Sequence, residues 1–214
     1  MLSQYYTVKE FGENQIVIER SRFIAHVSRA ETEEQAQEFI QTIKKKHWDA
    51  THNCSAYLIG ENNHIQKAND DGEPSGTAGV PILEVLKKKD LKDTVVVITR
   101  YFGGIKLGAG GLIRAYGKAT SEGIKATGVV ERQLMRVMHT KVDYTWLGKL
   151  ENELRHHSFY RLKEIHYLEN VEFETYVKES EIQNFLDWMT ELTNGQAMIN
   201  KGDLLYLEEK IAIN

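Results

Sequence analysis

The pattern of hydrophobic and polar positions predicts short strands and amphipathic helices in alternation. The first strands are predicted at Tyr5–Val8, Gln15–Glu19 and Arg22–Ser28. A capping box then predicts a helix that continues to about His47, because the Thr32 hydroxyl can accept from the Gln35 amide while the Gln35 side chain reaches back.

The middle of the chain predicts a hairpin, a helix, a strand, a glycine loop and a second helix. The strand Thr94–Arg100 is rich in β-branched residues and is expected to be buried on both faces. Pro81 is tolerated only in the first turn of a helix. The predicted elements are the hairpin strands Cys54–Ile59 and His64–Lys67 with their turn Gly60–Asn63, the helix Thr77–Lys89, the loop Gly103–Gly111 and the helix Leu112–Ala126.

The last third of the chain predicts the element order β-α-β-β-α-β, the split βαβ of a ferredoxin-like sandwich. The last strand is expected to be interrupted near Lys201–Asp203, and Ser180 is expected to cap the second helix. The predicted elements are Leu134–Tyr144, Trp146–His157, Tyr160–Tyr167, Val171–Val177, a helix from Ser180 to Leu192, and Ala197–Glu208.

The composition, with 41% hydrophobic and 27% charged residues, is that of a soluble globular protein. The longest apolar runs are too short to span a bilayer, and residues 1–6 lack the features of a signal peptide, so no membrane partner is expected. Cys54 is the single cysteine, which excludes an internal disulfide and any multi-cysteine metal site. The simplest compartment is the cytoplasm.

Charge divides unevenly along the chain. Residues 1–132 carry 18 basic and 17 acidic side chains, a net charge of +1, whereas residues 133–214 carry 9 and 14, a net charge of −5. This shift near Gln133 predicts two domains, 1–132 and 133–214. Neither is basic enough to indicate nucleic-acid binding by charge alone, so such a contact requires a local patch, and no DNA sequence readout is expected.

The first candidate motif combines carboxylates with turn residues. Three carboxylates within four residues could bind a hard cation, although their spacing is not that of an EF-hand. The alternative interpretation is a tight turn in which Ser75 or Thr77 caps the following helix. The motif residues are Asp70, Asp71, Gly72, Glu73, Pro74, Ser75, Gly76 and Thr77.

The second motif runs from a β-branched strand through glycines into a helix. Such a segment can direct free backbone amides and a helix N-terminus at an anion, and aromatic side chains beside it can stack on RNA bases. The glycines can equally serve packing alone. The candidate anion or nucleic-acid ligands are Arg100, Tyr101, Phe102, Gly103, Gly104, Lys106, Gly108, Gly110, Gly111 and Arg114.

Other reactive residue types give weaker signals. His52 and Cys54 suggest a thiol nucleophile, but their spacing on a strand does not ensure a hydrogen bond, and a buried thiol is the simpler interpretation. The lysine triplets 44–46 and 87–89 suit helix C-termini or, alternatively, a phosphate-contacting patch. We expect no catalytic residues, no metal ligands and no cofactor.

Together, Asp70–Leu83 and Val97–Tyr116 resemble the signature of the YigZ/YvyE/IMPACT family, and the strand His52–Tyr57 fits it as well. The resemblance covers essentially the whole chain. It implies an α+β fold whose N-terminal domain is similar to domain IV of elongation factor EF-G, a ribosomal-protein-type β-α-β fold. It also implies a ferredoxin-like C-terminal domain similar to EF-G domain V.

The resemblance also bears on function. Eukaryotic relatives are linked to translational control through binding to a regulator of an initiation-factor kinase. Some relatives are labelled proline dipeptidases, but no dinuclear-metal ligand set stands out in this sequence. We therefore expect a non-catalytic binding protein that contacts RNA, the ribosome or a translation factor. The alternatives are an enzyme or sensor for a small phosphorylated ligand, and a protein-interaction adaptor.

Overall fold

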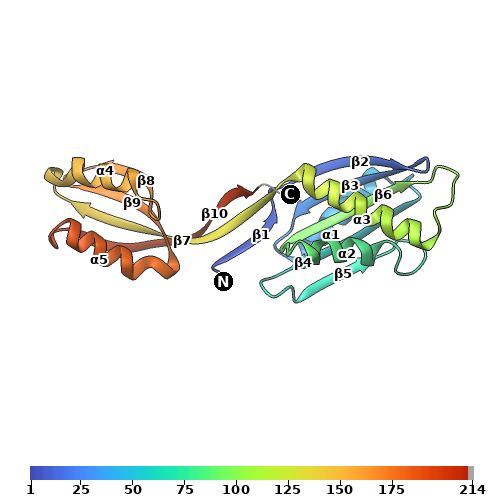
Figure 1. Ribbon diagram of the computed structural model, residues 1–214, viewed down its shortest axis with the longest axis horizontal. Helices are drawn as coiled ribbons and strands as arrows, with labels where there is room; N and C mark the ends of the chain where they lie inside the picture. The colour runs from blue at the N-terminus through green and yellow to red at the C-terminus, as the bar shows by residue number, and fades with distance from the viewer. Residues whose placement is uncertain (212–214) are drawn as a thin grey trace. The chain divides into compact units, whose positions relative to one another are not determined.

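The computed structural model describes residues 1–211, which form ten strands and five α-helices in two sheets (Figure 1). Two units have dense internal contacts. The N-terminal unit comprises Tyr5–Glu131 and residues 209–211, and the C-terminal unit comprises Arg132–Glu208 together with Met1–Gln4. Within residues 1–211, no helix is both long and apolar enough to cross a membrane.

The N-terminal unit is built on a five-stranded sheet in the order β2-β3-β6-β4-β5, whose neighbouring strands are all antiparallel. The central strand β6 is buried at every position except its last, Tyr101, which confirms the expectation from its β-branched sequence. The strands are β2 (Gly12–Ile18), β3 (Ser21–Arg29), β4 (His52–Ile59), β5 (Ile65–Asn69) and β6 (Thr94–Tyr101).

Helices cover both faces of this sheet. The helices α2 (Gly79–Lys88) and α3 (Gly108–Thr127) pack on one face, where Phe23, Ile98 and Tyr116 are fully buried in the larger core. The helix α1 (Glu33–Lys46) packs on the other face over a smaller apolar cluster. The connections of such a sheet lie at the ends of its strands. The first candidate motif follows the end of β5, and the second begins at the end of β6.

The predicted cap of α1 is present. The Thr32 hydroxyl accepts a hydrogen bond from the Gln35 amide at 3.3 Å. The Gln35 side chain reaches back to the amide of Glu31 at 2.8 Å, one residue before the position that a standard capping box uses. The start of this helix was therefore correctly located from local sequence.

The C-terminal unit has the predicted element order. Its sheet places β9 between β7 and β8, with β10 and β1 also beside the long strand β7. Both helices contribute to one core, which includes Leu150, Phe173 and Phe185. The elements of this unit are β7 (Val129–Val142), α4 (Leu147–His156), β8 (Arg161–Tyr167), β9 (Val171–Lys178), α5 (Ile182–Leu192) and β10 (Met198–Ile211), with short 3-10 turns at Tyr144–Trp146 and Glu179–Glu181. Strand β1 (Gln4–Val8) lies in the N-terminal unit except for its first residue.

Several element boundaries differ from the prediction; β7, for example, begins at Val129 and not at Leu134. Helix α3 begins at Gly108 rather than Leu112, so its first turn includes glycines that the low helix propensity of this residue assigned to the loop. Strand β10 continues without interruption through Lys201–Asp203, where it is supported by pairing with β7. Ser180 lies inside a 3-10 turn and does not cap α5, whose N-cap position is Glu181.

Candidate functional site

The carboxylates of the first motif do not converge on a common point. Asp70 accepts hydrogen bonds from the amides of Gly76, Ala78 and Gly79 at 2.8, 3.0 and 2.8 Å, and so caps helix α2. Burial raises the pKa of Asp70, but these amide bonds outweigh burial and hold the pKa below its ordinary value.

The cap of α2 corrects the prediction that Ser75 or Thr77 would supply it. The Thr77 hydroxyl instead donates to the Pro74 carbonyl at 2.6 Å. Ser75 is exposed at the surface of the turn. Local sequence favoured the nearest hydroxyls, but the backbone turn brings a carboxylate from farther upstream to the helix N-terminus.

Asp71 joins the turn to the strand and helix beside it. One carboxylate oxygen accepts from Lys44 Nζ at 2.6 Å, and the other accepts from the Asn53 amide at 2.7 Å. Its backbone carbonyl accepts from His52 Nδ1 at 2.8 Å. The backbone is left-handed at both Asp71 (φ 46°) and Gly72 (φ 87°), and glycine adopts this conformation without the steric cost of a Cβ.

Glu73 is the buried centre of a polar network. Its Oε1 accepts from Arg100 NH1 at 2.6 Å and from the Tyr116 hydroxyl at 2.8 Å. Tyr116 in turn accepts from the Cys54 thiol at 3.3 Å. Burial is the largest cause that raises the pKa of Tyr116. Burial also raises the pKa of the Cys54 thiol to about 12, so the thiol stays protonated at neutral pH and does not act as a nucleophile.

This network corrects the role expected of Arg100. Its side chain is 5% exposed, and its charge is neutralised by Glu73. The second guanidinium nitrogen donates to the Ser21 hydroxyl at 3.3 Å, while the group also lies over the rings of Phe23 and Phe102. Arg100 therefore fixes the base of the glycine loop and is not a free cation for a phosphate.

Tyr101 is also engaged within the protein. The guanidinium of Arg22 lies 4.3 Å from the centre of its ring. Its hydroxyl contacts His47 Nδ1 at 3.0 Å and donates to Asp49 at 3.1 Å. Tyr101 is half-buried whereas Phe102 is 46% exposed, so Phe102 is the more accessible platform for a stacked base.

The glycine loop between β6 and α3 remains largely open to solvent. Gly104, Lys106, Gly108, Gly110 and Arg114 are exposed, whereas Gly111 is half-buried. Helix α3 has no side-chain cap and no acidic residue in its first turn. Its first amides are therefore not satisfied by a capping side chain, and its dipole favours an anion.

Gly103 has a different role from the rest of the loop. A Cβ at this position would lie 2.1 Å from backbone atoms of Arg20. Its amide donates to the Ser21 hydroxyl at 3.2 Å, the same hydroxyl that Arg100 contacts. Gly103 therefore serves close packing, which is the alternative interpretation that the sequence left open for all glycines of the loop.

The two motifs meet at a pocket of about 440 Å³. Glu73 and Pro74 of the first motif line it together with Arg100, Phe102 and Lys106 of the second. His52 also lines this pocket, and its Nε2 lies 3.8 Å from Glu73 Oε2. From the sequence, His52 was considered as a partner of Cys54. No local pattern showed that the turn would bring Glu73 close to His52.

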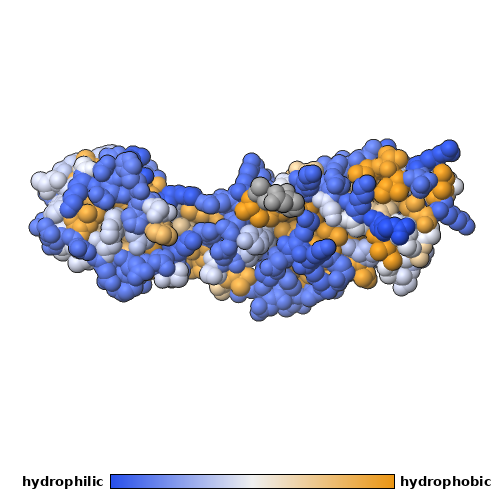
Figure 2. All heavy atoms as spheres, viewed as in Figure 1, coloured by the Kyte–Doolittle hydropathy of each residue, from blue (hydrophilic) through white to orange (hydrophobic). Residues whose placement is uncertain are grey.

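A second pocket of about 490 Å³ lies against the same loop, and Lys106, Arg114 and Lys118 line it. Lys118 was missed, although its spacing four residues after Arg114 places both cations on one face of a helix. Figure 2 shows hydrophobic surface beside hydrophilic surface over α3 and this loop, where Ile105 and Ile113 are exposed.

The lysine triplets differ from the cations of the glycine loop because some of their side chains form ion pairs with carboxylates. In the first triplet, Lys44 pairs with Asp71 at 2.6 Å and Lys46 with Glu13 at 3.0 Å. Both triplets lie in the last turns of helices, α1 and α2, as their dipole-complementing interpretation predicts.

Comparisons with known proteins agree in placing this chain among relatives of similar length. Residues 19–124 match the model of the Impact N-terminal domain, and residues 140–196 match a domain of unknown function, DUF1949. "IMPACT family member YvyE" of Bacillus subtilis (strain 168) is 72% identical over 99% of this chain and 97% of its own length. An "IMPACT family member" of Haemophilus influenzae is 34% identical over 85% of this chain and 89% of its own.

A solved structure has the same fold over nearly the whole chain. The "Crystal structure of an hypothetical protein" matches with a TM-score of 0.60 and 25% identity, covering 98% of this chain and 100% of that one.

Proposed function

Because this chain belongs to the IMPACT family, we propose that it is a cytoplasmic binding protein of the translation apparatus that holds RNA phosphates at its glycine loop. Family membership supports the translational setting, through the role implied for the eukaryotic relatives. The observation that carries the proposed contact is the uncapped, exposed N-terminus of the 20-residue helix α3, flanked by cations. This site offers backbone amides, a favourable dipole and ammonium or guanidinium groups to neighbouring RNA phosphates.

The cations near this helix end favour a binding role over a structural one. Lys106 lies two residues before α3, where a positive charge opposes the helix dipole and does not stabilise the helix. Lys106, Arg114 and Lys118 are exposed, and none forms an ion pair with a residue in the described range 1–211. Unpaired cations beside free amides are the arrangement that an anionic partner would complete.

Exposed apolar side chains distinguish RNA from a simple anion. Phe102 and Ile105 are 46% and 37% exposed, on either side of Gly103 and Gly104. An exposed aromatic ring can stack an unpaired base while neighbouring cations hold its phosphate. The resemblance of the two domains to EF-G domains IV and V supports the ribosome as the setting, by analogy of fold.

The test is binding to ribosomes and to single-stranded RNA by a variant with Lys106→Ala and Arg114→Ala. We expect weaker binding, with the slope of log affinity against log salt reduced by about 1.4, since each lost phosphate contact on a single strand contributes about 0.7. The matched control is Lys45→Ala with Lys125→Ala, two exposed lysines outside the loop that give the same change in net charge.

The result expected is a loss specific to the loop variant. If the wild-type protein does not bind RNA, or if both double variants bind equally well, the proposed contact is wrong. A nuclease-treated arm is included, because partners retained after nuclease treatment would support the adaptor alternative.

A second candidate function rests on the pocket of about 440 Å³ that joins the two motifs. His52, Phe102 and Lys106 line a volume suitable for a small phosphorylated ligand. A thermal-shift screen with nucleotides and divalent ions tests it, because a ligand that binds the folded state raises the melting temperature. A flat response across the screen would exclude this candidate.

A further inference from the structure

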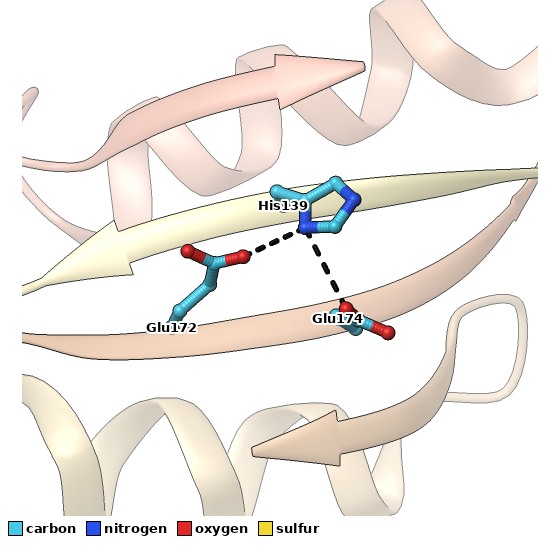
Figure 3. A group of neighbouring side chains, drawn as sticks. All are labelled: His139, Glu172 and Glu174. Atoms are coloured by element: carbon cyan, nitrogen blue, oxygen red, sulfur yellow. Dashed lines mark hydrogen bonds and ion pairs between the residues drawn. The ribbon is translucent and has the colours of Figure 1, made fainter. Parts of the chain in front are cut away.

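The face of the C-terminal sheet opposite its core carries a cluster of imidazoles and carboxylates. Alternation places Met138 and Val142 of β7 in the core, so that His139 lies on the other face. In β9, Phe173 is in the core and Glu172 and Glu174 are on the face of His139. Figure 3 shows His139 of one strand pointing between the two carboxylates of the next.

The ligand atoms of His139, Glu172 and Glu174 all lie within 4.8 Å of one another, close enough to share one ion. His139 Nδ1 lies 2.7 Å from Glu172 Oε1 and 3.7 Å from Glu174 Oε1. His166 Nε2, from β8, lies 3.2 Å from the same Glu174 oxygen. Ligand atoms about 2.1 Å from a tetrahedral ion lie roughly 3.4 Å apart, so small side-chain shifts would suffice.

Each carboxylate keeps one oxygen for this cluster and has the other held by a lysine. Lys141 Nζ contacts Glu172 Oε2 at 3.1 Å, and Lys163 Nζ donates to Glu174 Oε2. The lysines therefore fix the carboxylates without blocking the oxygens that face the imidazoles. Hydrogen-bonded outer partners of this kind orient the ligands in metal sites.

The surroundings prepare these groups for a cation. The side chains of Glu172 and Glu174 are 15% and 13% exposed. Both carboxylates are therefore largely withdrawn from water, where a charged group is stabilised by pairing or by metal coordination.

A glycine in the neighbouring strand fixes the ring of His139. A Cβ at Gly202 of β10 would lie 2.3 Å from His139 Nε2, so only glycine admits the ring in this position. The carbonyl of Gly202 accepts from Arg136 at 3.1 Å, which holds this part of β10 in place. The approach of Gly202 on the Nε2 side leaves Nδ1 as the nitrogen directed at the carboxylates.

We propose that His139, Glu172 and Glu174 bind one divalent transition-metal ion of the Zn²⁺ type, next to His166, which contacts Glu174. A mixed set of imidazole nitrogens and carboxylate oxygens is suited to Zn²⁺, whereas Mg²⁺ and Ca²⁺ prefer oxygen ligands alone. No metal ligands were expected from the sequence, where His139 lies 33 residues before Glu172 and no local spacing links them. This site is independent of the glycine loop.

The test is titration of the untagged full-length protein with Zn²⁺ in competition with a chromophoric chelator. We expect one saturable site per chain, loss of at least about 100-fold in affinity for His139→Ala, and a comparable loss for Glu172→Gln, which preserves the shape of the side chain. Replacing the outer partner, in Lys141→Met, should cost about 10-fold. The matched control is His156→Ala, an exposed histidine of the same unit whose recorded hydrogen bond is to its own helix.

The proposal is overturned if the wild type shows no saturable Zn²⁺ binding, or if His139→Ala and His156→Ala bind alike. A thermal-shift series completes the test: Zn²⁺ should raise the melting temperature of the wild type and of His156→Ala but not of Glu172→Gln. A shift of equal size with Mg²⁺ would exclude a nitrogen-containing site. Because no RNA is present, these outcomes do not depend on the proposed function.

Discussion

The two motifs of the N-terminal unit use their polar atoms in opposite ways. In the turn Asp70–Thr77, each carboxylate is bound within the protein, by the N-terminus of α2, by Lys44 or by Arg100. In the loop that leads into α3, the helix N-terminus lacks a capping side chain and the cations lack partners among the described residues. Both segments are rich in glycine and charge, yet only one presents unsatisfied groups to solvent.

This difference indicates where stability and binding are located. A buried polar group that loses its partner costs free energy, so the turn should be sensitive to substitution. Exposed charges without partners contribute little to folding. Substitutions in the loop should therefore leave the free energy of unfolding nearly unchanged while weakening the binding of a ligand. The comparison can be tested with substitutions ordered by the size of their expected effect.

The largest effect is expected at the centre of the buried network. Glu73→Ala leaves the 5%-exposed side chain of Arg100 without its countercharge, and should lower the free energy of unfolding by about 3–5 kcal/mol. Urea denaturation measures this change. Glu73→Leu combined with Arg100→Met removes both charges and should recover much of the loss; a loss below about 1 kcal/mol for Glu73→Ala would show that the ion pair is not structurally important.

A smaller effect is expected from the cap of α2. Asp70→Ala removes the acceptor of three amides, and should lower the free energy of unfolding by about 2 kcal/mol at pH 7. Because the pKa of Asp70 is lowered in the folded state, its contribution is complete above its unfolded pKa of about 4 and is lost as pH falls through the folded pKa.

The measurement for Asp70 is the stability difference between the wild type and Asp70→Ala as a function of pH. This difference should be constant above about pH 5 and should shrink in acid. A difference that grew as pH fell would contradict the capping role.

In the loop, the conformation of one glycine should matter slightly. Gly104 has φ 87° with open space around it, so Gly104→Ala should cost about 1 kcal/mol through backbone strain alone. Gly148 in α4 also has open space but no positive φ, and Gly148→Ala should instead stabilise the protein by about 0.5–1 kcal/mol. Equal effects at the two positions would rule out the strain argument.

The smallest effect on stability is expected from the cations of the loop. Lys106→Ala with Arg114→Ala should change the free energy of unfolding by less than about 0.5 kcal/mol, because neither side chain is buried or ion-paired within residues 1–211. Urea denaturation of this double variant is the measurement. A decrease in the free energy of unfolding of more than about 2 kcal/mol would show that the loop, like the turn, is a structural segment. That result would argue against the proposed binding role.

Much of the secondary structure could be predicted because it depends on local pattern. Patterns of neighbouring residues correctly predicted three features: the capping box at Thr32, the β-branched strand β6, and the βαββαβ order of the C-terminal unit. The continuity of β10 could not be predicted locally, because it depends on pairing with β7. The start of α3 could not either, because a run of glycines carries no local helix signal.

The sequence by itself determined the elements, the family and the two glycine-containing motifs, because each is encoded in residues close together along the chain. Only the tertiary structure decided which charged groups are available. Glu73 and Arg100 are 27 residues apart in sequence, and His139 and Glu174 come from different strands, so neither pairing has a local signal. Charges interact over a few ångströms through space, and that distance is set by the fold and not by sequence spacing.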